Sequence, residues 1–263
     1  MSERVYRSLQ ALLMLLLFIF LAEKVVSGRL SWYINLRFMP LTILGILILG
    51  AMAQIIFTDL RRTREKKASV KKARRQEHHQ HEHDHDHDHD HDHNPAWGNL
   101  LFLAIPLFVG VLIPARPLDA SAVATRGLTT SAPLVSSDSA AKVFETASEE
   151  RNVLDWLRLF GSQSDLASFL GESASVTGFV FRDEKLTANQ FYLGRFVVSC
   201  CSADGSAIAL VVEWPEAASM QENAWALVKG PMGALTLDGT RTPLLQAETV
   251  EFIQEPAQPY LYP

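Results

Sequence analysis

The residues best suited to chemistry are histidines and carboxylates that alternate in one tract. Residues 78–93 read HHQHEHDHDHDHDHDH and hold all nine histidines of the 263-residue chain. Neutral imidazole is a good ligand for zinc, nickel and copper, and a carboxylate can fill a remaining position. We therefore expect the tract to bind divalent metal ions through the following side chains: His78, His79, His81, His83, His85, His87, His89, His91, His93, Asp84, Asp86, Asp88, Asp90 and Asp92.

The composition of this tract also indicates what kind of site it forms. A segment without apolar residues builds no core, so we expect disorder in the absence of metal. Because nothing fixes its geometry, it suits a buffer, sensor or delivery arm better than a catalytic centre. Zn2+ is the ion we expect, with Ni2+, Cu2+ and Co2+ as alternatives, since such a tract does not choose among them. No organic cofactor is expected, and a solvated linker without function is the alternative.

A second candidate site is the string CCSAD, which holds Cys200, Cys201 and Asp204. On a strand the two cysteines would point to opposite faces. Two small buried side chains are one interpretation, because free cysteine is among the most buried residue types. A thiolate metal site with Asp204 as an oxygen ligand, a redox pair and a strained vicinal disulfide are the others.

Several functional classes are excluded or disfavoured by what the C-terminal half lacks. It has no histidine, which removes Ser-His-Asp triads and Cys-His pairs, so we expect no catalytic residue and no enzyme. Adjacent cysteines cannot close an ordinary disulfide loop within the chain. From Arg116 onward the chain has ten basic and eighteen acidic residues, which gives no reason to expect nucleic-acid binding.

Three apolar segments dominate the N-terminal half. Val5–Val26 predicts a transmembrane helix, with a cleaved signal peptide as the alternative. Leu41–Phe57 spans roughly 25 Å as a helix and predicts a second crossing. Trp97–Pro114 contains Pro106 and fourteen clean apolar residues, so it predicts a third crossing or a re-entrant segment.

The distribution of basic residues predicts the orientation of these segments. Residues 61–75 hold nine Lys or Arg against one acid, whereas the loop from Lys24 to Arg37 holds three. Positive loops stay cytoplasmic. We therefore expect a multi-pass protein of the plasma membrane, with the His-rich loop in the cytoplasm and the C-terminal domain outside it.

The C-terminal half changes character after a segment rich in Pro, Ser, Thr and Ala. Lys142–Phe160 has apolar residues at mostly helical spacing. Five short runs rich in Val, Ile, Phe and Trp then predict strands: Ser175–Phe181, Arg195–Cys201, Ala207–Trp214, Ala224–Lys229 and Thr249–Ile253. With a helix near Glu216–Asn223, this order suggests a mainly-β, OB-like barrel.

The predicted fold class is thus a membrane-anchored chain with two to three N-terminal transmembrane α-helices and a C-terminal mainly-β domain. The expected divisions follow along the chain: 1–60, two transmembrane helices; 61–96, a disordered basic and His/Asp-rich loop; 97–115, a third apolar segment; 116–141, a linker; 142–256, the helix and barrel; 257–263, a tail.

Several short motifs together resemble one known family. They are LIPARPL at 112–118, DWL at 155–157, TGFV at 177–180 and CCSAD at 200–204, in a chain with three apolar segments and a His-rich loop. The chain resembles the YcgQ family of uncharacterised membrane proteins, which are regarded as permease subunits. The resemblance implies a larger multi-spanning permease of the YcgR type as partner, sometimes in metal homeostasis.

We accordingly expect an accessory subunit of a membrane permease that is linked to divalent metal, most simply zinc. Its partners would be the permease, membrane lipids and metal ions. A membrane-anchored metal buffer or chaperone without a permease and an extracytoplasmic binding module are the alternatives. An extracytoplasmic thiol oxidoreductase is disfavoured, because the chain contains no C-x-x-C motif.

Overall fold

The computed structural model describes residues 3–76, 97–113, 116–131, 143, 145–162, 169–237 and 239–263. The chain divides into two compact units. The first comprises Met1–Arg29 and Met39–Ala115, and the second comprises Leu30–Phe38 and Arg116–Pro263. The short segment Leu30–Phe38, which joins the first two long helices, therefore belongs to the C-terminal unit.

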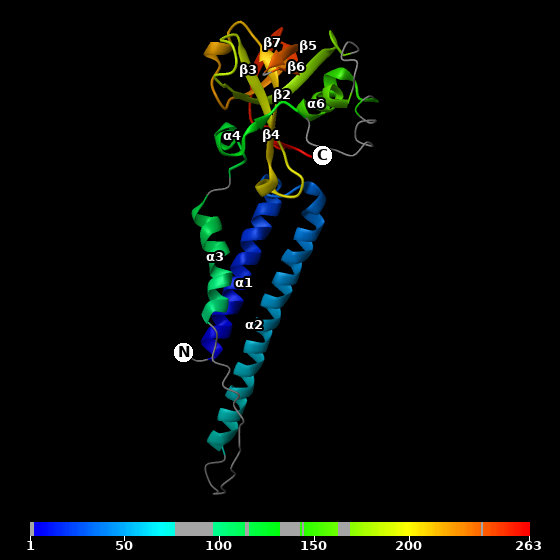
Figure 1. Cartoon of the computed structure of the whole chain (residues 1–263). Helices are drawn as coiled ribbons and strands as arrows, with labels where there is room; N and C mark the ends of the chain where they lie inside the picture. Colours follow the sequence, from blue (N-terminus) through cyan, green and yellow to red (C-terminus); the bar gives the residue numbers. More distant parts are fainter. Residues whose placement is uncertain are drawn as a thin grey trace. The chain divides into compact units, whose positions relative to one another are not determined.

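The described residues of the N-terminal unit form three long helices, α1 (Glu3–Val26), α2 (Met39–Gln76) and α3 (Trp97–Leu112) (Figure 1). By length and composition, α1 and α2 are long and apolar enough to cross a membrane. The apolar helix α3 is shorter. Two apolar N-terminal helices are thus confirmed.

Aromatic side chains of α1 pack against glycines of the other two helices. The ring of Phe18 would lie 2.9 Å from a Cβ placed on Gly50 of α2, and the ring of Phe20 would lie 2.6 Å from one placed on Gly110 of α3. A glycine lets a bulky neighbour approach the helix backbone, as is common between membrane helices. The helix α1 therefore packs against both α2 and α3.

The helix α2 is longer than its apolar part. It has 38 residues and continues through the basic run to Gln76. The prediction that the chain is disordered from residue 61 is therefore wrong for 61–76. Straight-chain Lys, Arg and Glu, together with Ala, favour helix, and this explains the extension. The His/Asp tract at 78–93 lies outside the described residues.

The C-terminal unit is mainly β, as predicted. Its strands are β1 (Leu128–Thr129), β2 (Ser173–Phe181), β3 (Gln190–Val197), β4 (Ser206–Glu213), β5 (Trp225–Leu237), β6 (Thr240–Gln246), β7 (Thr249–Ile253) and β8 (Tyr260–Leu261). Among the described residues they form one sheet in the order β1-β4-β6-β5-β2-β3-β8, with β7 on β5 and a further pairing of β3 with β4.

The predicted OB-like barrel is not supported. The β3–β4 pairing closes a ring of hydrogen-bonded strands, but the β2–β3 and β4–β6 pairings in that ring each extend over only three residue pairs. The helix expected at Glu216–Asn223 is reduced to the 3-10 turn η6 (Ala217–Ser219). Asn223 has a φ of 66°, a conformation that ends helical structure.

The core of this unit includes α6 (Val153–Ser162), one face of which is fully buried. Asn152 begins the helix, because its side-chain oxygen accepts hydrogen bonds from the amides of Leu154 and Asp155. Trp156 is 0% exposed in the main hydrophobic cluster. The predicted helix was longer, and its residues Lys142 and Phe144 lie outside the described residues.

The predicted linker 116–141 is wrong for residues 116–131. Here the chain forms α4 (Ala120–Arg126), and β1 pairs in parallel with β4. Asp119 caps the helix, and Val123 is buried. Alternating small and apolar residues, rather than a flexible composition, allow this segment to pack on the strands.

The predicted tail 257–263 is likewise part of the sheet. Tyr260 is 2% exposed and lies in β8, which pairs with β3. The buried guanidinium of Arg195 donates hydrogen bonds to the carbonyls of Thr177 and Gln258. Desolvation lowers the pKa of Arg195 to about 10. The end of the chain therefore covers a buried cation.

A single glycine allows β5 to change partners. The strand pairs with β7 up to Lys229 and with β6 from Met232. Between them, a Cβ on Gly230 would lie 1.9 Å from the carbonyl oxygen of Gln246. Because no side chain fits there, β5 can bridge the two strands only with glycine at this position.

Candidate metal centre

Cys200 and Cys201 lie in the loop between β3 and β4, not on a strand as predicted. The β3–β4 ladder ends at the pair Val197–Ser206, and the 3-10 turn η5 (Ser202–Asp204) closes the loop. The interpretation that both cysteines are buried is also wrong, because Cys200 is exposed and Cys201 is partly exposed.

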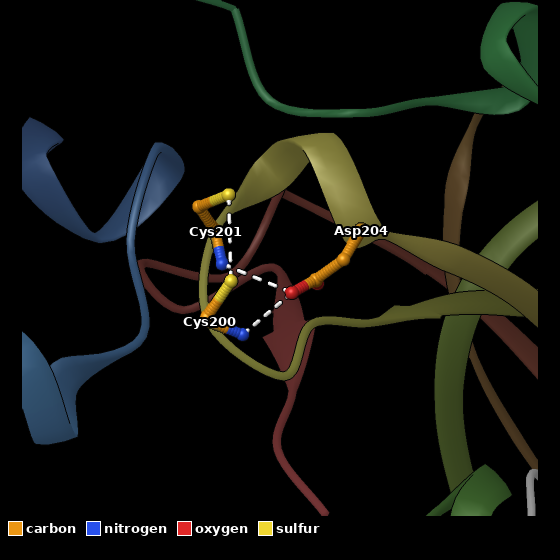
Figure 2. A group of neighbouring side chains, drawn as sticks. All are labelled: Cys200, Cys201 and Asp204. Carbon is orange, nitrogen blue, oxygen red and sulfur yellow. Dashed lines mark hydrogen bonds between the residues drawn. The ribbon is translucent and has the colours of Figure 1, made fainter.

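Asp204 determines the shape of this loop. One carboxylate oxygen accepts a hydrogen bond from the amide of Ser199 at 2.9 Å. The other accepts from the amides of Cys200 at 2.7 Å and Cys201 at 3.3 Å (Figure 2). These three donors would otherwise have no strand partner. The carboxylate therefore turns the chain out of β3 and brings both cysteines toward itself.

The two thiols lie side by side in this loop. The Cys200 thiol donates a hydrogen bond to the sulfur of Cys201 at 3.6 Å (Figure 2). Within the described part of the chain, ligand atoms of Cys200, Cys201 and Asp204 all lie within 4.8 Å of one another. The structure thus brings together the three residues of the second candidate site.

The carboxylate keeps Cys200 protonated. Its hydrogen bond to Asp204, and then that to Cys201, raises the pKa of the Cys200 thiol to about 11. Desolvation raises the pKa of Asp204, but hydrogen bonds from the Cys200 thiol and three backbone amides lower it below its ordinary value. At neutral pH the Cys200 thiol is therefore protonated and lies beside the Asp204 carboxylate.

The segment Leu30–Phe38 is hydrogen-bonded to the backbone of this loop. Ile34 forms an antiparallel bridge with Cys201. The amide of Asn35 donates to the carbonyl of Cys200 at 3.0 Å, and the amide of Ser202 donates to the carbonyl of Tyr33 at 2.8 Å. The backbone that carries the thiols is therefore also the backbone that holds this segment.

Asn35 fixes the segment further through its side chain. The side-chain nitrogen donates to the carbonyl of Ser199 at 2.9 Å, and the side-chain oxygen accepts from the amide of Arg37 at 2.9 Å. Asn35 is buried, with 8% of its surface exposed. Sequence reasoning missed this residue, although an asparagine beside apolar residues in a short connection is a signal for a side-chain-stabilised turn.

Tyr260 links the segment to the end of the chain. Its hydroxyl donates to the carbonyl of Trp32 at 3.2 Å and accepts from the amide of Leu118 at 2.8 Å. Three stretches that are distant in the sequence therefore meet at this hydroxyl. The candidate site accordingly lies beside a buried junction of the C-terminal unit.

Comparisons with known proteins also divide the chain into an N-terminal and a C-terminal domain. Residues 9–129 match the DUF1980 N-terminal domain, and residues 136–263 match the DUF1980 C-terminal domain. The chain belongs to the DUF1980 family. It is also similar to the UPF0703 protein YcgQ of Bacillus subtilis (strain 168), with 25% identity over 273 aligned positions that cover 90% of this chain and 92% of that protein. No solved structure matches the chain.

The comparison supports the resemblance to the YcgQ family, and the loop with Cys200, Cys201 and Asp204 falls within the DUF1980 C-terminal domain. The His/Asp tract falls within the range of the N-terminal domain. The metal and the partner of this DUF1980 protein remain predictions.

Proposed function

We propose that this DUF1980 protein is a membrane-anchored accessory subunit of a permease, linked to the handling of a divalent metal such as zinc. The observation that carries the proposal is the large apolar surface of its helices that no other part of the described chain covers. In the apolar 18-residue stretch of α1, only 11% is buried within the chain. The corresponding stretch of α2 is also 11% buried. On α2 and α3, Leu47 is 61% exposed and Phe102 is 77% exposed. Lipid or another apolar protein surface must cover such faces.

The docking of Leu30–Phe38 supports a three-crossing arrangement. If α1 and α2 both cross, this segment lies on one side of the membrane and Gln76 on the other. The segment is bonded to the loop of the C-terminal unit, so that unit shares its side. The chain must then return between Gln76 and Arg116, and α3 is the apolar helix described there. With the basic run in the cytoplasm, the C-terminal unit lies outside and the N-terminus inside.

A partner follows from the composition of the helices. The apolar segments contain very few polar residues, of which Thr42, Gln54 and Asn99 are examples. Ion pathways through membranes are lined by polar or charged groups. Three such helices make a poor pathway alone, so a multi-spanning partner would provide the route while this subunit presents metal through its His/Asp tract.

Photo-cross-linking from intact membranes tests this proposal. A photoreactive amino acid would replace Leu47 or Phe102 in the full chain, with the same replacement at Met14, which is 7% exposed, as the matched control. We expect the exposed positions to form adducts with one multi-spanning protein and the control to form none. Purification of that complex, followed by elemental analysis, should recover zinc or a related metal.

The alternative is a metal buffer or chaperone that works without a permease. It makes the opposite prediction for the same experiment. Adducts with lipid or with a second copy alone, together with bound metal, would favour the buffer and overturn the accessory-subunit proposal. A protein that carries no metal in cells replete with zinc, nickel and copper would contradict both.

A further inference from the structure

We propose that Cys200, Cys201 and Asp204 form an open site for a thiophilic divalent cation of the zinc and cadmium class, whose occupation tightens the segment Leu30–Phe38. The site is separate from the His/Asp tract in chemistry and in position along the chain. The proposal that these residues bind a cation depends on the described geometry alone. Only the position of the site outside the cytoplasm rests on the proposed function.

The separation of the sulfur atoms fits a tetrahedral metal better than a disulfide. Two thiolates bound to one Zn2+ at about 2.3 Å, in tetrahedral geometry, lie about 3.8 Å apart. The sulfur atoms of Cys200 and Cys201 are 3.6 Å apart. A disulfide requires about 2.05 Å. The thiols therefore need almost no movement to bind one ion together.

Asp204 supplies an oxygen ligand and holds the loop in place. It accepts hydrogen bonds from three backbone amides, and a carboxylate has about four lone-pair directions. The fourth direction faces the Cys200 thiol in the free site, and it becomes available to a metal when the thiol proton leaves. On binding, the cation replaces the protons of the two thiols, which pass to solvent. The bound site is then two thiolates and one carboxylate, with soft sulfur selecting zinc or cadmium over magnesium or calcium.

Three protein ligands leave a four-coordinate ion with an open position. Structural zinc sites are closed by four ligands, whereas exchangeable or reactive sites keep a position free. The side chain of Cys200 is exposed, so a donor or acceptor can reach the ion directly. No histidine of the chain lies in the C-terminal unit to close the site. These features suit an ion that is received and passed on.

Backbone contacts connect the proposed metal site to the segment Leu30–Phe38. The carbonyl of Cys200 and the bridge at Cys201 hold Asn35 and Ile34. A metal bound to both sulfur atoms fixes the two residues that make these contacts. The segment Leu30–Phe38 lies between α1 and α2 in the chain, so the bound metal fixes part of the connection between these helices.

Cadmium titration of the full chain in detergent tests the site. Sulfur bound to Cd2+ gives an ultraviolet charge-transfer absorption that imidazole and carboxylate do not give, so the His/Asp tract is silent in this measurement. We expect Cd2+ to produce the band, with one equivalent sufficient in a chain whose nine histidines are changed to Asn, and Zn2+ to compete it away. The double variant Cys200→Ser/Cys201→Ser should lose the band, whereas Ser202→Ala and a chain with all nine histidines changed to Asn should keep it.

Hydrogen exchange on the same samples tests the coupling. Amides of residues 30–38 should exchange at least several-fold more slowly with Cd2+ in the wild type and not in the double variant. Absence of the band in the wild type, or its persistence without the cysteines, overturns the site. A band without slower exchange at 30–38 overturns the coupling. Neither result depends on recovery of a permease, so failure of the proposed function is seen separately in the cross-linking experiment.

Discussion

The amide of Asn35 donates a hydrogen bond to the carbonyl of Cys200 across 165 positions of the sequence, at 3.0 Å. This contact joins a short connection between two apolar helices to the loop that holds both cysteines of the chain. The two units are therefore interleaved in the sequence, because the chain enters the C-terminal unit at Leu30, leaves it after Phe38 and enters it again at Arg116.

Replacement of Asn35 by Ala should destabilise the C-terminal unit. The change leaves the carbonyl of Ser199 and the amide of Arg37 without their partner, at a cost of about 1–2 kcal/mol. We expect Tm to fall by about 2–8 °C, measured by near-ultraviolet circular dichroism in detergent. The matched control is Asn189→Ala on the exposed surface, which should leave Tm nearly unchanged. Equal effects of the two variants would contradict the role of Asn35.

Removal of the Asp204 charge should activate Cys200 toward alkylation. In a Cys201→Ser background, Asp204→Asn should lower the pKa of Cys200, because the hydrogen bond to Asp204 is the largest cause of its elevation. A fall in pKa of about one unit raises the thiolate fraction at pH 8 about tenfold, while lower nucleophilicity takes back about threefold. Iodoacetamide should therefore react at least about threefold faster. A rate equal to or below that of the parent would show that the carboxylate does not hold the proton.

The two glycines of β5 should respond differently to a methyl group. Gly230→Ala places Cβ against the backbone carbonyl of Gln246 and should cost about 3 kcal/mol or more, since neither strand can withdraw. Gly233→Ala is the matched control, because its nearest atom would lie 3.5 Å away. Thermal unfolding and expression level would report the difference. Comparable stability of both variants would rule out the close approach of β5 and β6.

Thiol labelling of intact cells should report the proposed topology. The chain has two cysteines, both in the C-terminal unit. A membrane-impermeant maleimide should label the wild type from outside. In a Cys200→Ser/Cys201→Ser background, Ser69→Cys on the basic part of α2 should be labelled only after the membrane is opened. Labelling of Ser69→Cys in intact cells would place the basic run outside and refute the proposed orientation. Labelling of both Ser69→Cys and the native cysteines from outside would refute the three-crossing arrangement.

Loss of the histidines should remove most of the loosely bound metal. Changing all nine histidines from His78 to His93 to Asn keeps the length and the charge at neutral pH, and we expect zinc binding at the tract to disappear in calorimetry at pH 7.5. Binding to the unaltered tract should weaken as pH falls through about 6.5, where imidazole becomes protonated. A matched chain with Asp84, Asp86, Asp88, Asp90 and Asp92 changed to Asn should retain much of it. An unchanged zinc isotherm without the histidines would exclude the tract as the site.

The sequence predicted the helices and strands that depend on local composition and on the spacing of apolar residues. Long apolar runs indicated α1 and α2, and alternating β-branched and aromatic residues indicated most strands. It missed β6, because Pro243 argues against a strand. In the structure Pro243 opposes Ala234 of β5 and precedes the residues of β6 that pair with β4, so its missing amide donor is not needed on the β4 side.

The candidate site was predicted in its residues but not in its geometry. Adjacent cysteines on a regular strand would face apart, and only the carboxylate of Asp204 overrides that alternation. The contribution of Asn35 depends on a contact between distant parts of the chain, which local pattern does not encode. The helical extension of α2 was not predicted, although Lys, Arg, Glu and Ala in the basic run all have high helix propensity.

The helical extension of α2 determines how far from the membrane the His/Asp tract would bind its ions. With α2 upright in a membrane, the residues from Arg61 to Gln76 rise about 24 Å above the apolar part, roughly three times the screening distance of about 8 Å in physiological salt. In the proposed orientation, the end of α2 at Gln76 would then lie in bulk cytosol, beyond the field of anionic lipid headgroups. Lipid phosphates would not compete for the ions of the tract, and exchange with soluble donors would be governed by diffusion in three dimensions.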